Sequence, residues 1–121
     1  MRYVRIRSDD AGGSVFEDID APMRESHVVD GVPPLLVSDP LPVNAMIFVE
    51  QPPGTPDWAS HVAPRRQWVM VLSGRVAITV SNGERREFGP GEPVLVEDTQ
   101  GQGHVSTPLT EDFVFVMIPI G

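Results

Sequence analysis

The sequence predicts a single-domain, all-β protein with little or no helix, and three observations support this fold class. Short runs of alternating apolar and polar residues recur along the chain, and this is the period of a strand with one buried face. Eleven glycines and thirteen prolines interrupt the 121 residues, which leaves little room for long helices. Turn signals separate the runs roughly every 8–12 residues, a spacing typical of a sandwich or small barrel.

The N-terminal part of the chain holds one clear strand and much irregular sequence. Apolar and polar residues alternate over residues 3–7, which predicts a strand with one buried face. Nine of the thirteen prolines lie between Pro22 and Pro64, and this density predicts extended segments and loops. We therefore expect residues 1–42 to form an arm with proline-rich loops, and residues 43–121 to form the core of the single domain.

The C-terminal part carries the stronger strand signals. Asn82-Gly83 predicts a hairpin, because both residues tolerate the positive φ of a type I′ turn. Residues 112–120 are apolar on both faces, which predicts a central strand. A short helix is expected over residues 20–26, with Asp20 as its N-cap. The remaining strands are expected over residues 43–50, 67–72, 75–81, 84–88 and 93–97.

Charge and composition exclude several function classes. The net charge is −8, and all nine basic residues are arginines. An acidic chain repels phosphate groups, so neither nucleic acid nor an anionic membrane is an expected partner. The absence of lysine removes Schiff-base chemistry, and the absence of cysteine removes disulfides and thiolate sites. With no apolar run long enough for a membrane span or a signal core, we expect a cytoplasmic protein.

Two short motifs lie between His61 and His104. In the first, His61, Gln67 and Gly74 follow one another at fixed spacing; in the second, the turn Phe88-Gly89-Pro90-Gly91-Glu92 precedes an apolar strand and then His104. In these motifs the chain resembles the cupin superfamily, and in particular its small single-domain members. The resemblance implies a jelly-roll barrel, also called a double-stranded β-helix, and a homodimer.

The resemblance also implies a degenerate metal motif. Typical cupins hold a divalent metal with three histidines and one glutamate. Here His61 and His104 occupy two of those positions, while Ala63 and Gln67 replace a histidine and the glutamate. The implied metal site therefore consists of His61, His104 and Gln67, with Fe, Mn, Ni, Cu or Zn as the ion. The alternative is a metal-free barrel in which these side chains hydrogen-bond each other or a ligand.

Four further residues are candidates for binding a ligand beside Gln67. Arg65 and Arg66 are adjacent, so in an extended chain they point to opposite sides. One of them either binds a carboxylate at the barrel mouth or forms a surface ion pair. Trp58 either stacks on a flat ligand or packs in the core. Asp98 either accepts a hydrogen bond from an imidazole or bonds its own turn, and the sequence favours the turn.

These residues lead to three function hypotheses. In the first, the barrel binds or acts on a small organic molecule, as an isomerase, cyclase or oxygenase. His61 and His104 then either hold the metal or act as general acid–base groups. In the second, the chain is a metal-free binding or sensory protein without catalysis. In the third, it has an assembly role, with residues 3–7 as a dimerisation arm. The sequence leaves open whether the chain is an enzyme.

Overall fold

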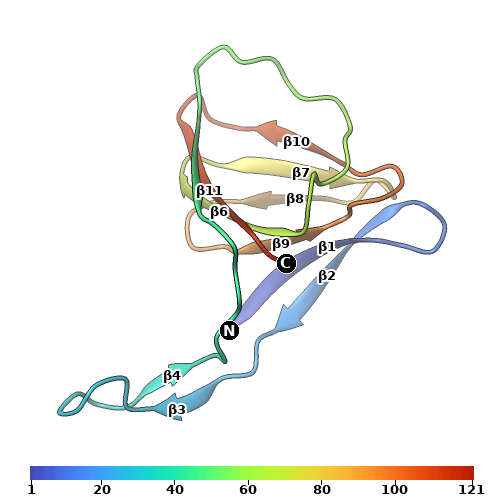
Figure 1. Ribbon diagram of the computed structural model, residues 1–121. Coiled ribbons are helices and arrows are strands. Elements are labelled where there is room, and N and C mark those ends of the chain that lie inside the picture. Colours follow the sequence, from blue (N-terminus) through green and yellow to red (C-terminus); the bar gives the residue numbers. More distant parts are fainter.

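The computed structural model describes all 121 residues and contains three β-sheets and no helix (Figure 1). The predicted all-β class is confirmed. The structure contains no helix that could span a membrane. The strands are β1 (Arg2–Ser8), β2 (Ser14–Asp20), β3 (Arg24–Ser26), β4 (Leu35–Val37), β5 (Ile47–Gln51), β6 (Gln67–Ser73), β7 (Val76–Val80), β8 (Arg85–Phe88), β9 (Val94–Glu97), β10 (His104–Pro108) and β11 (Phe113–Pro119).

The largest sheet joins both ends of the chain. Its six strands run in the order β2-β1-β9-β6-β11-β5, and β1 pairs antiparallel with β2 and parallel with β9. β11 lies between β6 and β5, so the prediction of a central strand over residues 112–120 is confirmed. A second sheet has the order β10-β7-β8. No strand of this sheet pairs with the larger one, so the two sheets do not close into a continuous barrel.

The core lies between these two sheets. Val76, Ile78 and Val80 alternate along β7 and pack against inward residues of the large sheet, including Ile6 and Val71. Ile6 is completely buried. This arrangement confirms the strands predicted over residues 3–7 and 75–81. The inward side chains are two residues apart because successive side chains of a strand point to opposite faces. The expected arm over residues 1–42 is therefore divided, because residues 2–20 belong to the large sheet and not to a free segment.

A serine pair joins the start of β2 to the residue that follows β7, and so connects the two larger sheets. The backbone N–H of Ser14 donates to Oγ of Ser81 at 2.6 Å, and the N–H of Ser81 donates to Oγ of Ser14 at 3.0 Å. The Ser14 hydroxyl also donates to the carbonyl oxygen of Gly103 at 2.6 Å. Ser14 is fully buried, so these bonds satisfy polar groups that burial would otherwise leave without partners. They also fix the loop that leads into β10.

Arg86 forms a second connection between the two larger sheets. Its guanidinium lies 4.9 Å from the ring centre of Phe16 and donates to Asp18 at 2.8 Å, both on β2. Burial lowers the pKa of Arg86, but hydrogen bonds to Asp18 and Glu84 outweigh that effect and raise the pKa above its usual value. The guanidinium therefore stays charged and links β8 to β2.

Two local expectations are wrong. No helix forms over residues 20–26: Asp20 ends β2, and residues 24–26 are β3. Pro22 favours an extended residue before it, which opposes a helical start there. The hairpin at Asn82-Gly83 forms, but only Gly83 has a positive φ, so the turn is not type I′. The Asn82 side chain instead accepts a hydrogen bond from the N–H of Glu84 at 2.9 Å.

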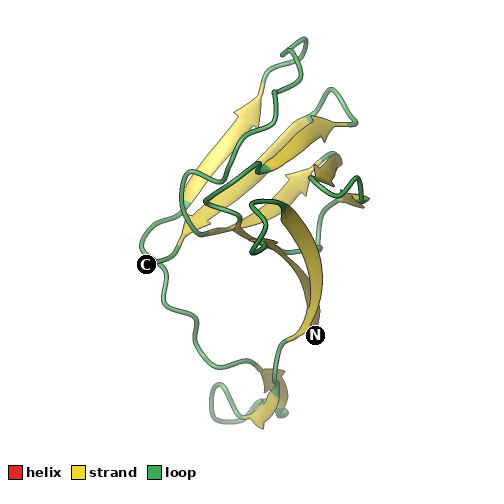
Figure 2. Ribbon diagram, turned by 90° about the vertical axis from the view of Figure 1, so that its right-hand side faces the viewer, coloured by secondary structure: helices red, strands yellow, loops and turns green.

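Residues 22–43 project from the two larger sheets, as Figures 1 and 2 show, and we call this segment the projecting arm. Backbone bonds from Ala21 to Met1 and from Asn44 to Pro119 mark its two ends. Within it, β3 pairs only with β4, and Arg24 forms an ion pair with Asp39. No hydrogen bond or ion pair joins the arm to the rest of the chain.

Candidate functional site

A cavity of about 360 Å³ opens between the two larger sheets. Of its 18 lining residues, ten are hydrophobic and none is acidic. They come from the inward faces of the strands and from the loop that precedes β6. The polar lining residues are Gln51, His61, Arg65, Gln67, His104 and Ser106. A concave, mostly apolar space with a few converging polar groups is the usual form of a small-molecule site.

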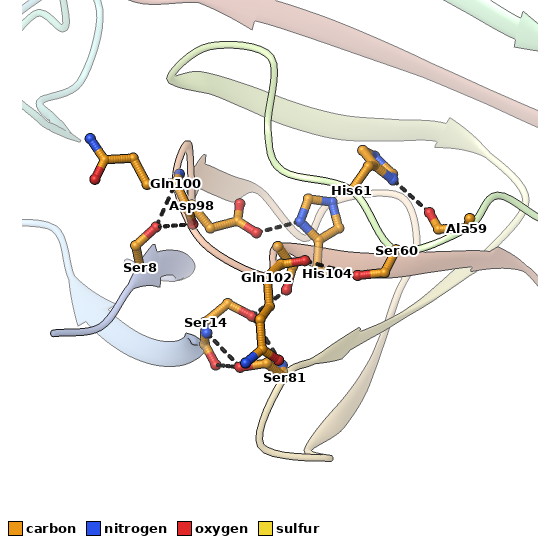
Figure 3. A network of polar contacts seen from close by, with 11 residues as sticks. Ser8, Ser14, Ala59, Ser60, His61, Ser81, Asp98, Gln100, Gln102 and His104 are labelled. Carbon is orange, nitrogen blue, oxygen red and sulfur yellow. Dashed lines mark hydrogen bonds and ion pairs between the residues drawn. The ribbon is translucent and has the colours of Figure 1, made fainter. Parts of the chain in front are cut away.

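His104 enters this cavity with a carboxylate behind it. Its Nδ1 lies 2.6 Å from Oδ2 of Asp98, which is fully buried, and Figure 3 shows the ring between Asp98 and His61. The other oxygen of Asp98, Oδ1, has no hydrogen-bond partner. A buried carboxylate is costly unless a partner compensates it, so His104 is the group that stabilises Asp98. Asp98 in turn fixes the orientation of the ring.

His61 lies beside His104 at the cavity. The two ring centres are 4.9 Å apart, and Nδ1 of His61 lies 3.0 Å from the carbonyl oxygen of Ala59. Because a carbonyl oxygen only accepts, Nδ1 of His61 carries the proton and Nε2 is left as an acceptor. With Asp98 ionised, the same argument applies to His104. Both imidazoles therefore have their Nδ1 atoms engaged, which leaves the Nε2 atoms free for a ligand.

The two histidines are brought together by their backbones. His61 and His104 form an isolated antiparallel bridge, with N–H to O distances of 3.0 and 2.9 Å. The bridge depends on Gly103, which has φ of +73° and lies against the carbonyl of His61. A Cβ at this position would collide with that carbonyl, so only glycine permits the close approach.

Gln67 and Arg65 form the other polar side of the cavity. Gln67 is 4% exposed, and its Oε1 accepts a hydrogen bond from Nε of Arg65 at 3.2 Å. Its Nε2 lies 3.5 Å from the sulfur of Met117, which is a weak acceptor. Gln67 therefore holds the Arg65 guanidinium at the cavity, while Arg65 itself remains exposed.

The residues at the cavity fit a divalent metal poorly. No group of three or more His, Asp or Glu side chains lies together in the structure. His61 and His104 supply two free nitrogens, but the oxygen of Gln67, the third predicted ligand, is bound to the positive guanidinium of Arg65. A cation at this position opposes a second cation. The metal site stays a prediction, and the function proposed below does not use it.

The structure separates the predicted ligand-binding residues. Trp58 lines the cavity with its ring centre 5.3 Å from that of His61. Arg66 does not reach the cavity, because its guanidinium is bound to Glu97, which also binds Arg5. Asp98 does not line the cavity either, because it lies behind His104. Its side chain bonds the imidazole and not its own turn, so the turn interpretation that the sequence favoured is wrong.

Two polar lining residues were not predicted, Gln51 and Ser106. The two-residue period of a strand could have identified both. Ser106 is two residues beyond His104 on β10, and residues two apart share a face. The sequence did not predict β10 as a strand, so this relation to His104 was missed. Gln51 lies one residue beyond the strand expected over residues 43–50.

We expect Gly103→Ala to separate the two histidines. The substitution adds a collision with His61 to the roughly 1–2 kcal/mol that a left-handed conformation costs an L-residue. Gly83→Ala is the matched control, because Gly83 also has a positive φ but has no atom within 4 Å of an added Cβ. Thermal unfolding should show a clearly larger loss of stability for Gly103→Ala. Equal losses would mean that the close approach at His61 contributes nothing.

Comparison with known proteins adds no family to this description. No family model matches the sequence, and no curated protein is found to be similar to it. Function therefore has to be inferred from the residues and the geometry of the cavity.

Proposed function

We propose that the chain is a cupin-type protein whose cavity binds a small organic molecule and transfers a proton to or from it through His104. The observation that carries the proposal is the Asp98–His104 pair, with Nδ1 and Oδ2 2.6 Å apart, directed into a mostly apolar cavity. The two facing sheets and the meeting of His61 with His104 at one cavity are consistent with the cupin motifs in the sequence.

The chemistry follows from the state of the two rings. Nε2 of His104 accepts a proton from the bound molecule, and Asp98 stabilises the imidazolium that forms. Nε2 of His61, beside it, accepts a hydrogen bond from the same molecule. Proton removal next to a carbonyl, followed by its return at another atom, is the reaction of an isomerase. The apolar lining strengthens these electrostatic effects, because apolar side chains screen charge less than water does.

The second candidate function is binding without catalysis. It is favoured by the departures from the metal motif at Ala63 and Gln67 and by the hydrophobic lining of the cavity. In that case His61 and His104 act only as hydrogen-bonding groups for a ligand. The two functions differ in one observable, which is whether removing Nε2 of His104 changes a rate or only an affinity.

Elimination of 5-nitrobenzisoxazole tests the proton transfer directly. A base removes the proton at C3 of this probe, the N–O bond breaks, and a coloured cyanophenolate forms. We expect the wild-type protein to accelerate the reaction and His104→Gln to lose roughly 10²-fold of that rate, the usual contribution of a general base. Asp98→Asn should also lose activity and shift the pH profile, because an amide can donate to Nδ1 and leave the proton on Nε2.

His27→Gln is the control for this assay. His27 lies on the projecting arm and contacts only the carbonyl of Val32, 3.3 Å away. Its replacement should leave the rate unchanged. A wild-type rate equal to that of His104→Gln would contradict proton transfer by His104 and favour the binding function.

A further inference from the structure

The cavity lining contains one of the two arginines that lack an acidic partner, Arg65; the other, Arg75, lies outside the cavity. Seven of the nine arginines lie within 4 Å of a carboxylate. Arg65 has no such partner, and its only side-chain hydrogen bond runs from Nε to Gln67. Its two Nη groups are therefore free. In a chain with 17 acidic residues, this free fork at a cavity is an unusual placement of charge.

Arg65 is the only permanently charged group in the cavity lining. The other titratable groups there are the imidazoles of His61 and His104, and no Asp or Glu lines the space. The chain as a whole carries a net charge of −8, and the acid that lies behind this lining, Asp98, is paired with His104. A neutral ligand gains nothing from that arrangement. An anion gains a planar, permanently charged fork that matches a carboxylate in a bidentate geometry.

The rest of the cavity lining is mostly apolar. The rings of Phe113 and Phe115 stack with centres 5.0 Å apart, and Val69 and Met117 lie in the same lining. A carboxylate bound by Arg65 would therefore have its carbon skeleton among hydrophobic side chains. A volume of about 360 Å³ is near the lower end of the range for small-molecule sites, which suits a compact ligand.

We propose that the ligand is a compact organic monocarboxylate with an aromatic or aliphatic body. Its carboxylate is bound by the Nη groups of Arg65, its body packs against Phe113 and Phe115, and the His61–His104 pair faces the part between them. This inference rests on the proposed use of the cavity for a small molecule. It adds a charge requirement that proton transfer by His104 does not itself demand.

Charge selectivity tests this proposal. The probes are benzoate, 3-phenylpropanoate and octanoate, each paired with its uncharged primary amide, and calorimetry measures binding to the full chain. We expect the carboxylates to bind the wild type at least about tenfold more tightly than the amides, as for an added charged hydrogen bond of roughly 1.5–3 kcal/mol. Arg65→Gln should remove this preference while the amides still bind.

Arg66→Gln is the matched control, because Arg66 is the neighbouring arginine and pairs with Glu97 outside the cavity. It should keep the preference for carboxylates. Equal binding of acids and amides to the wild type would overturn the charge requirement and leave the small-molecule cavity intact. A preference that survives in Arg65→Gln would overturn the role of Arg65. Binding of no probe would overturn both the monocarboxylate and the use of the cavity for such molecules.

A different observation concerns the outer face of the large sheet, which is apolar although the core lies on its other face. Leu72 and Phe48 on this outer face are 50% and 69% exposed. Sheets with one face on the core usually present polar residues on the other. Two rows cross the strands in register, Phe48–Val116–Met70 and Ile118–Trp68–Leu95.

The projecting arm has the complementary property. Among its residues, Val28, Val29, Leu35, Leu36 and Leu41 are each more than half exposed. A two-stranded hairpin is marginally stable by itself in water, and this one is bonded to nothing else in the chain. On the sheet face, Val116, Trp68 and Leu95 are already buried within the chain, and Leu72 and Phe48 are the exposed residues. One chain therefore presents exposed apolar residues both on the arm and around Leu72 and Phe48.

We infer that the arm of one copy lies on the outer sheet face of a second copy, and that the exchange is mutual. The arm has 22 residues, which matches the roughly 20–30 residues that each partner contributes to a stable interface of standard size. With a twofold axis between the copies, the arm of each chain lies on the sheet face of the other, and the assembly closes as a dimer.

Mass in solution and crosslinking test the exchange. Light scattering should give the wild type twice the 13.2 kDa of one chain. Leu36→Glu on the arm and Phe48→Glu on the sheet should each give the single-chain mass with an unchanged far-ultraviolet spectrum, since both side chains are exposed in one chain. Leu109→Glu is the control, because Leu109 is exposed outside both surfaces and its variant should keep the double mass.

A photoreactive benzophenone side chain at position 36 locates the contact. It should crosslink to residues 68–72 or 114–118 of the second copy. A single-chain mass for the wild type would overturn the proposal. A double mass that survives both glutamate variants, or crosslinks only to other parts of the second copy, would show that the arm does not cover this face.

Discussion

The backbone bridge between His61 and His104 is the contact on which the candidate site depends. It ties the loop before β6 to the start of β10, and a second bond from the N–H of Ala63 to the carbonyl of Asp98 reinforces it. Gly103 permits the approach, and the buried hydroxyl of Ser14 holds the carbonyl of Gly103 from the edge of β2. His104 therefore takes its position from the first residue of β10, and the bridge holds His61, in the loop before β6, against it.

The distribution of charge divides the molecule into three regions. Ion pairs between arginines and acids lie along the exterior, as in the Arg5–Glu97–Arg66 cluster. The cavity keeps only imidazoles and one guanidinium, without an acid in its lining. The outer face of β6, β11 and β5 and the projecting arm carry the exposed apolar residues. The proposed proton transfer and the proposed exchange of arms therefore use different surfaces, so a variant can test one without altering the other.

The sequence predicted the elements whose period was regular and missed those set by tertiary contacts. Alternation at Val4 and Ile6, and along β7, identified the buried faces. β2 was missed because its acidic residues, which are uncommon in strands, are compensated there by arginines of β1 and β8. The resemblance to cupins implied that His61, Gln67 and His104 lie at one site, and all three line the cavity. Spacing does not report the direction of a side chain, so neither the Asp98–His104 bond nor the outward turn of Arg66 could be read from it.

The protonation of the two imidazoles tests the central claim most directly. Long-range ¹H–¹⁵N spectra of the wild type distinguish the two ring nitrogens of each histidine. The account predicts that His104 carries a slowly exchanging proton on Nδ1, and that Asp98→Asn removes this signal while that of His27 is unchanged. A neutral His104 ring with its proton on Nε2 would contradict it, because the nitrogen that faces the cavity would then be unable to accept a proton.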